Sequence, residues 1–137
     1  MYALVMEDDL ELLDLLAGYF VPSITGCDPA HVVGRRSVGE LAKLNLMDDD
    51  DPIVLVTDGN LLDGTCADVV AYVIGTFGAA RLRGRALLLS ANPKSDWDHV
   101  FAAARSGGIE LSYRQKPFSP EDIESWWNEA RFCFLGT

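Results

Sequence analysis

The sequence has few basic residues, few cysteines and no long apolar run. It holds 11 Lys and Arg against 21 Asp and Glu, a net charge of -10, so it lacks the basic face typical of nucleic-acid-binding proteins. The densest basic run, Arg81 to Arg85, fits a solvated loop. No apolar stretch approaches the roughly 18 residues of a membrane span. We therefore expect a cytoplasmic protein that binds neither nucleic acid nor membrane.

The three cysteines are too few and too scattered to form a disulfide framework or a metal motif. The number of cysteines is odd, and the spacing of Cys27, Cys66 and Cys133 matches no zinc site. Reduced thiols, as in the cytosol, are expected.

The chain is long enough for one domain and apolar enough to bury a core. It has 137 residues, of which 49% are apolar and 23% are charged, as in globular proteins. We find no internal repeat and no linker, so we expect a single domain over residues 1–137.

Short apolar runs alternate with segments of helical spacing. The runs predict strands at Ala3–Met6, His31–Arg36, Pro52–Thr57, Ala86–Leu89 and Ile109–Arg114. The intervening segments predict helices over 12–20 (ending before Pro22), Val38–Leu46, Thr65–Phe77, Asp96–Arg105 and from 120 to about 132. Strands this apolar need cover on both faces. The pattern therefore predicts an α/β fold with a doubly wound, five-stranded parallel sheet.

Chemically related side chains follow four of these strands. Glu7 and Asp8 follow the first strand, Asp58 the third, Ser90 the fourth and Lys116 the fifth. Ligand sites of doubly wound sheets lie beyond the carboxyl ends of the strands, so these side chains are expected to converge.

The predicted cluster suits phosphoryl chemistry. Three carboxylates repel one another unless a cation joins them, and oxygen ligands beside phosphoryl groups favour Mg²⁺. A carboxylate such as Asp58 can attack phosphorus as a nucleophile. Lys116 and Ser90 can then place positive charge and a hydrogen bond on the phosphoryl oxygens.

In these residues the sequence resembles the response-regulator receiver family of two-component signal transduction. Four stretches carry the resemblance in family order: Val5-Met6-Glu7-Asp8-Asp9, Ile53-Val54-Leu55-Val56-Thr57-Asp58, Leu87-Leu88-Leu89-Ser90-Ala91 and Lys116-Pro117-Phe118. The resemblance covers essentially the whole chain. It implies a flavodoxin-like (βα)5 fold with strand order 2-1-3-4-5, and no output domain in this chain.

The resemblance also implies roles for the acidic residues. Asp58 would be the phosphoacceptor and a metal ligand. Glu7 and Asp8 would form the acidic pair that holds Mg²⁺, with Asp8 the direct ligand. Asn60 would offer its backbone carbonyl to the metal.

The remaining roles concern catalysis and switching. Ser90 matches the switch hydroxyl, and Lys116 the lysine that contacts the phosphoryl group. Tyr113 stands where the family places a rotating aromatic residue, and the bond before Pro117 is expected to be cis.

These roles imply a phosphorylation-dependent signalling switch. A histidine kinase or phosphotransfer protein would supply the phosphoryl group, and the domain would catalyse its own phosphorylation and dephosphorylation. The face formed by the fourth helix, fifth strand and fifth helix would bind a downstream protein or a second copy of the chain.

The loop after Asp58 departs from the family pattern. Only Gly59 to Leu62 separates Asp58 from Asp63-Gly64, which leaves open the metal contact of Asn60 and the lifetime of the phosphorylated state. One alternative is a degenerate pseudo-receiver that binds partners without phosphate. A haloacid-dehalogenase-like phosphatase is disfavoured, because Asn60 stands where a second aspartate is required.

The last predicted helix carries Trp126 and Trp127 in succession. Adjacent residues of a helix point in different directions, so one tryptophan is expected to be exposed or to cover a partner. The alternative, with Phe132 and Phe134, is a tail that folds back onto the sheet edge.

Overall fold

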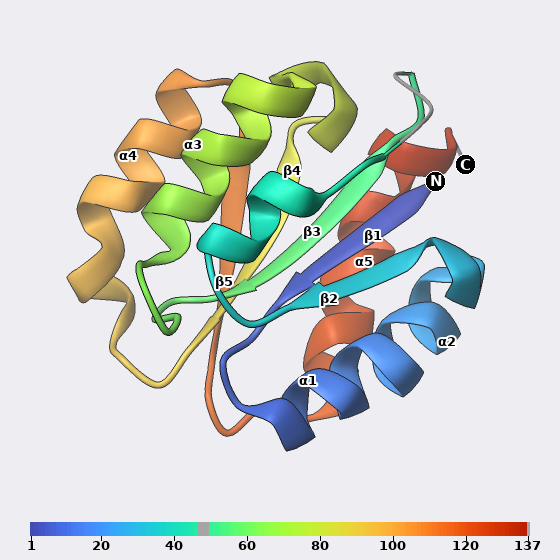
Figure 1. Cartoon of the computed structure of the whole chain (residues 1–137), viewed down its shortest axis with the longest axis horizontal. Helices are drawn as coiled ribbons and strands as arrows, with labels where there is room; N and C mark the ends of the chain where they lie inside the picture. Colours follow the sequence, from blue (N-terminus) through green and yellow to red (C-terminus); the bar gives the residue numbers. More distant parts are fainter. Residues whose placement is uncertain (47–49, 137) are drawn as a thin grey trace.

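The computed structural model describes residues 1–46 and 50–136 and contains one five-stranded sheet (Figure 1). All strand pairs are parallel and the order is β2-β1-β3-β4-β5. The strands are β1 (Tyr2–Met6), β2 (Val32–Arg35), β3 (Ile53–Asp58), β4 (Arg85–Ser90) and β5 (Glu110–Gln115). The predicted fold class and strand order are confirmed.

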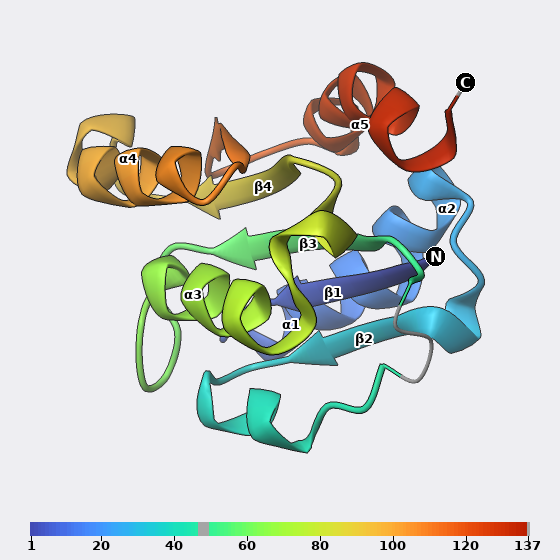
Figure 2. The same cartoon turned by 90° about the horizontal axis from the view of Figure 1, so that it is seen from above.

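Helices cover both faces of the sheet (Figure 2). They are α1 (Leu10–Leu15), α2 (Val21–Thr25), α3 (Cys66–Phe77), α4 (Asp98–Ser106) and α5 (Pro120–Leu135). In β1, Leu4 and Met6 face the core under α3 and α4, whereas Ala3 and Val5 face the core under α1, α2 and α5. This alternation is why the strands read as continuous apolar runs. Within the described residues, no helix is long and apolar enough to cross a membrane.

The first helical segment extends beyond the predicted end at Pro22. A π-helical turn, Leu16–Phe20, joins α1 to α2, and Pro22 lies in the first turn of α2. Val21 N–H bonds back to Leu16 across this wide turn, so the hydrogen-bond ladder is already rearranged where proline lacks its donor. The helix ends instead at Gly26, whose φ of 74° is left-handed.

The predicted helix Val38–Leu46 is also wrong. Only a 3₁₀ helix, Gly39–Lys43, forms there, and Leu44 is extended. The N–H groups of Val38 and Gly39 bond to the Asp63 carboxylate at 2.6 and 2.8 Å. This cap from the β3–α3 loop fixes the start of a single short turn, in a segment that glycine already weakens as a helix.

The starts of α3 and α5 follow their sequence signals. Thr65 and Asp68 form a capping box at α3, and Ser119 and Asp122 form one at α5. Helix α4 begins later than predicted, because a 3₁₀ helix at Lys94–Trp97 precedes it.

Trp126 and Trp127 are both buried, so the expectation that one is exposed is wrong. Helix α5 packs against the sheet and also against α2, and both indoles join the core on that side. Trp127 contacts Phe134, with ring centroids 5.6 Å apart. A helix with two packed neighbours buries a wider stripe than a helix with one. Phe132 is exposed.

Truncating a buried indole should cost much more stability than truncating an exposed ring. Trp127→Ala should lower the free energy of unfolding by roughly 3–5 kcal/mol, because it opens a cavity. Phe132→Ala, on the solvent side of the same helix, should change it by about 0.5 kcal/mol or less. Urea unfolding followed by circular dichroism measures both, and equal losses would contradict the packing of α5.

Candidate functional site

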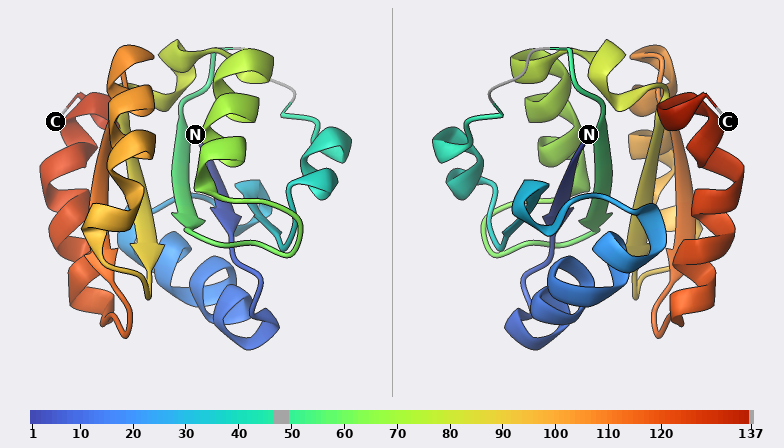
Figure 3. Two further views of the ribbon diagram at one scale, coloured as in Figure 1. Left: turned by 90° about the vertical axis from the view of Figure 1, so that its left-hand side faces the viewer. Right: turned by 90° about the vertical axis from the view of Figure 1, so that its right-hand side faces the viewer.

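The carboxyl ends of the strands lie at one edge of the sheet, where the arrowheads point in Figure 3. Glu7 and Asp8 follow β1, Asp58 ends β3 and Lys116 follows β5. The predicted charged residues therefore come together, although more than a hundred positions separate Glu7 from Lys116 in the chain.

One lysine serves a cluster of three carboxylates. Lys116 Nζ lies 2.5 Å from Glu7 Oε1 and 3.3 Å from Asp58 Oδ1. Glu7, Asp8 and Asp58 each offer an oxygen within 4.8 Å of the others. Glu7 and Asp58 are buried, whereas Asp8 is partly exposed. The cluster therefore holds more negative than positive charge in a site largely removed from water.

Burial and the neighbouring charged groups shift the pKa values of this cluster. Burial, together with the neighbouring Asp58, raises the pKa of Glu7 to about 8. Burial alone would raise the pKa of Asp8, but hydrogen bonds with Glu7 and Asp58 lower it below its ordinary value. Burial would lower the pKa of Lys116, but the contacts with Glu7 and Asp58 outweigh it and raise that pKa. Lys116 is thus a fixed cation at neutral pH.

The donor set fits a hard divalent cation. Three carboxylates supply oxygen ligands, the kind that Mg²⁺ and Ca²⁺ prefer. A cation among them would relieve the repulsion that helps to raise the pKa of Glu7. Glu7, Asp8 and Asp58 are the residues that could hold it.

Arg36 supports the acidic pair from the neighbouring strand. Its Nε and Nη2 donate to the backbone carbonyl of Asp8 at 3.1 and 3.0 Å. Sequence reasoning did not select Arg36, although it follows β2 and the same strand-end rule could have found it.

The Ser90 hydroxyl lies next to Gly59 and is held by two N–H groups. Trp97 Nε1 donates to Ser90 Oγ at 3.0 Å, and the backbone N–H of Asn92 donates at 3.1 Å. Ser90 and Trp97 are both buried. Sequence reasoning missed Trp97, because an indole in an amphipathic segment reads simply as core.

Gly59 leaves the space that the Trp97 indole fills. A Cβ on Gly59 would lie 2.5 Å from Trp97 Cζ2 and 2.9 Å from Ser90 Oγ. The small residue after Asp58 is therefore matched to a large residue from the β4–α4 connection.

Tyr113 contacts the same connection from β5. Its hydroxyl donates to the backbone carbonyl of Asn92, the residue whose N–H bonds to Ser90. The predicted switch residues, Ser90 and Tyr113, are thus linked through one peptide segment.

The short loop after Asp58 is closed on itself. Leu61 N–H bonds to Gly64 O, and Asn60 pairs with Thr65 in an isolated antiparallel bridge. Asn60 is exposed. Its predicted backbone contact with a metal stays a prediction.

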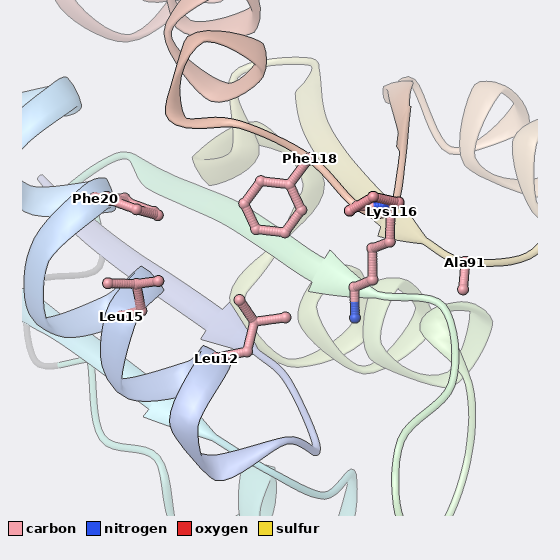
Figure 4. A pocket seen from close by; sticks show the side chains of 7 residues that line it. Leu12, Leu15, Phe20, Ala91, Lys116 and Phe118 are labelled. Atoms are coloured by element: carbon pink, nitrogen blue, oxygen red, sulfur yellow. The ribbon is translucent and has the colours of Figure 1, made fainter.

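An apolar groove of about 430 Å³ adjoins Lys116. The Lys116–Pro117 bond at its edge is cis. In Figure 4, Leu12, Leu15 and Phe20 face Phe118 across this groove, with Lys116 at one end. Lys116 thus borders an apolar groove on the α1 side.

The three cysteines are unpaired, as predicted. Burial raises the pKa of Cys66, at the start of α3, to about 12. A thiol with such a pKa is a poor nucleophile.

Substituting Gly59 should destabilise the protein by overpacking. Gly59→Ala should lower the free energy of unfolding by roughly 1–3 kcal/mol, because Trp97 or Ser90 must shift. Gly75→Ala is the control: Gly75 is exposed within α3 and its Cβ would meet nothing within 4 Å. That change should stabilise by about 0.5–1 kcal/mol. Denaturant unfolding checks both, and an unaltered Gly59→Ala midpoint would refute the close contact.

The raised pKa of Glu7 predicts a pH dependence of stability in metal-free protein. Below pH 4.5, its ordinary pKa, Glu7 is protonated in both folded and unfolded chains. As the pH rises from about 4.5 to 8, the unfolded chain releases this proton while the folded chain retains it, so stability falls. Glu7→Gln should flatten this decline in a series of melting temperatures. An identical decline in Glu7→Gln would mean that another group causes it.

Solved structures of receiver domains share this architecture. The non-phosphorylated HemR receiver domain from Leptospira biflexa has a TM-score of 0.63 and 18% identity, over 93% of this chain and 91% of that one. The signal receiver domain of an HD domain-containing protein from Pseudomonas fluorescens Pf-5 has a TM-score of 0.64 and 14% identity, over 94% and 85%. The phosphorylated cyanobacterial phytochrome response regulator RcpA has a TM-score of 0.59 and 16% identity, over 99% and 96%.

Comparison of the sequence with protein families and curated proteins finds no match. The structural likeness extends over nearly the whole chain. The protein therefore has the fold of response-regulator receiver domains.

Proposed function

We propose that this protein is a phosphorylation-dependent signalling switch whose phosphoacceptor is Asp58. The observation that carries the proposal is the contact of Lys116 with both Asp58 and Glu7 inside a cluster of three carboxylates. A fold of this kind does not need such a cluster for stability, since burying like charges is unfavourable. Its chemistry is that of a phosphoryl-transfer site.

The proposed reaction is transfer of a phosphoryl group to the Asp58 carboxylate. One Asp58 oxygen attacks phosphorus, a new P–O bond forms, and the bond from phosphorus to the donor breaks. With a phosphohistidine donor, on a histidine kinase or phosphotransfer protein, the leaving imidazole keeps the electron pair and takes up a proton. Lys116 neutralises charge on the transferred oxygens. Mg²⁺ held by Glu7, Asp8 and Asp58 would supply further charge neutralisation.

The proposed output is a change of the surface around α4, β5 and α5. A phosphoryl dianion beside Ser90 attracts its hydroxyl proton, and Ser90 is linked through Asn92 to Tyr113. A local change of charge can thus bias the position of the β4–α4 connection. A downstream protein or a second copy of the chain would bind this face.

The setting of this switch is proposed to be cytoplasmic, with residues 1–137 acting as one receiver domain. The net charge of -10 argues against nucleic acid or an anionic membrane as partner. Self-catalysed phosphorylation and dephosphorylation of Asp58 are the only chemical steps proposed.

A second candidate is a pseudo-receiver that binds partners without phosphate. The observation that favours it is the short, cross-bridged loop beside Asp58, in which Asn60 pairs with Thr65. If this loop cannot admit a phosphoryl group, the same surfaces could still bind a protein partner.

Chemical phosphorylation separates these functions. Acetyl phosphate with Mg²⁺ should add one phosphoryl group to the intact protein, measured by mass spectrometry, and Asp58→Asn should abolish the adduct. Asp9→Asn is the matched control, because Asp9 caps α1 and asparagine caps equally well. That variant should be phosphorylated like the unaltered protein.

Two other outcomes would reject the proposal. Absence of any adduct, with no binding of Mg²⁺ or beryllofluoride, would favour the pseudo-receiver. Sustained hydrolysis of small phosphate esters would favour a phosphatase.

A further inference from the structure

The connection between β4 and α4 contains a buried hydrogen bond that the proposed chemistry has not used. Trp97 Nε1 donates to Ser90 Oγ at 3.0 Å, and Trp97 is packed in the core with Val100 and Leu61. The indole is therefore a rigid donor, held by packing on the helix side of the acceptor site.

Two donors fill the acceptor positions of the serine hydroxyl. A hydroxyl has two lone pairs and one proton. Trp97 Nε1 and the Asn92 N–H occupy the lone pairs of Ser90 Oγ. No acceptor for the hydroxyl proton is found among residues 1–46 and 50–136. A buried donor without an acceptor is unfavourable, so this proton is available to a new acceptor.

The site supplies a place for such an acceptor. Ser90 Oγ lies 2.9 Å from the position that a Cβ of Gly59 would take. Gly59 directly follows Asp58 in the chain, so the hydroxyl lies beside the Asp58 site. A phosphoryl oxygen on Asp58 is an anionic acceptor, and charge-assisted hydrogen bonds are stronger than neutral ones. Accepting two N–H bonds also strengthens the hydroxyl as a donor.

We propose that Trp97 is a positioning residue for the switch: its indole N–H fixes Ser90 Oγ with the proton free for a phosphoryl oxygen, and thereby couples the Asp58 site to the start of α4. The inference rests on the proposed function of Asp58. It assigns to Trp97 a polar task beyond filling the core, and it explains why the residue at position 59 is a glycine.

The test measures the affinity for beryllofluoride with Mg²⁺, a mimic of the phosphoryl group, in the unaltered protein and four variants. Trp97→Phe keeps a packed ring but removes the N–H, and it should weaken binding about three- to tenfold, as expected for one net hydrogen bond. Ser90→Ala should weaken binding, and adding Trp97→Phe to it should cause no further loss. Trp126→Phe is the control, because its buried indole N–H has no partner in the described part of the chain. This variant should bind like the unaltered protein.

A measurement on the unaltered protein avoids any folding defect of the variants. The indole N–H resonance of Trp97 should shift when beryllofluoride and Mg²⁺ are added, while those of Trp126 and Trp127, in the opposite core, should stay in place. Ser90→Ala should move the Trp97 resonance of the free protein.

The outcomes distinguish this inference from the proposed function. If beryllofluoride shifts the backbone amides of Asp58 and Lys116 but leaves the Trp97 indole unchanged, the inference is overturned and the function of Asp58 stands. A Trp97→Phe effect that persists at full size in Ser90→Ala would also overturn it, because the effect would then come from packing. Absence of any beryllofluoride binding would overturn both.

Discussion

The contact of Lys116 with Glu7 and Asp58 is the interaction on which this site depends. It joins the first strand, the third strand and the segment after the fifth strand at one edge of the sheet. Without that cation, three carboxylates would face one another in a site with little water, and their repulsion would oppose folding. With it, two of the three carboxylates still have no cation of their own, and burial together with the neighbouring Asp58 raises the pKa of Glu7. The oxygen ligands of the site thus suit a second cation, such as Mg²⁺.

The sheet makes this arrangement rigid. β1 and β3 lie in the middle of the sheet, flanked by β2 and β4, and apolar side chains fill both of their faces. The backbone that carries Glu7 and Asp58 therefore cannot shift without disturbing two cores. By contrast, residues 91–96, between the buried side chains of Ser90 and Trp97, are mostly exposed. The charged residues Glu7 and Asp58 are thus fixed by the two central strands.

Much of this could be predicted from the sequence, because strands and strand ends obey local rules. A run such as Ile53 to Val56 must be buried on both faces, and the polar residue that follows it must lie at the edge. The errors came from one local rearrangement of a helix and from tertiary contacts. Pro22 stays inside a helix because a π-helical turn precedes it, and Trp126 and Trp127 are both buried because α5 has two neighbours. Asp63 shortens the second helix from a distant loop, which no local pattern reveals.

Gly59 and Trp97 explain the feature of the sequence that fitted the receiver pattern least. Taken alone, a short loop and a glycine after Asp58 suggest an acceptor site that has lost its cover. In the structure a side chain from the α4 side fills the space next to Gly59: the Trp97 indole occupies it and donates a hydrogen bond to Ser90. A larger residue at position 59 would collide with the indole at position 97, so the residues at these two positions depend on each other sterically. The loop also stays compact by its own bonds, Leu61 to Gly64 and Asn60 to Thr65. The short loop after Asp58 and the aromatic side chain on the α4 side are thus packed against each other at Gly59.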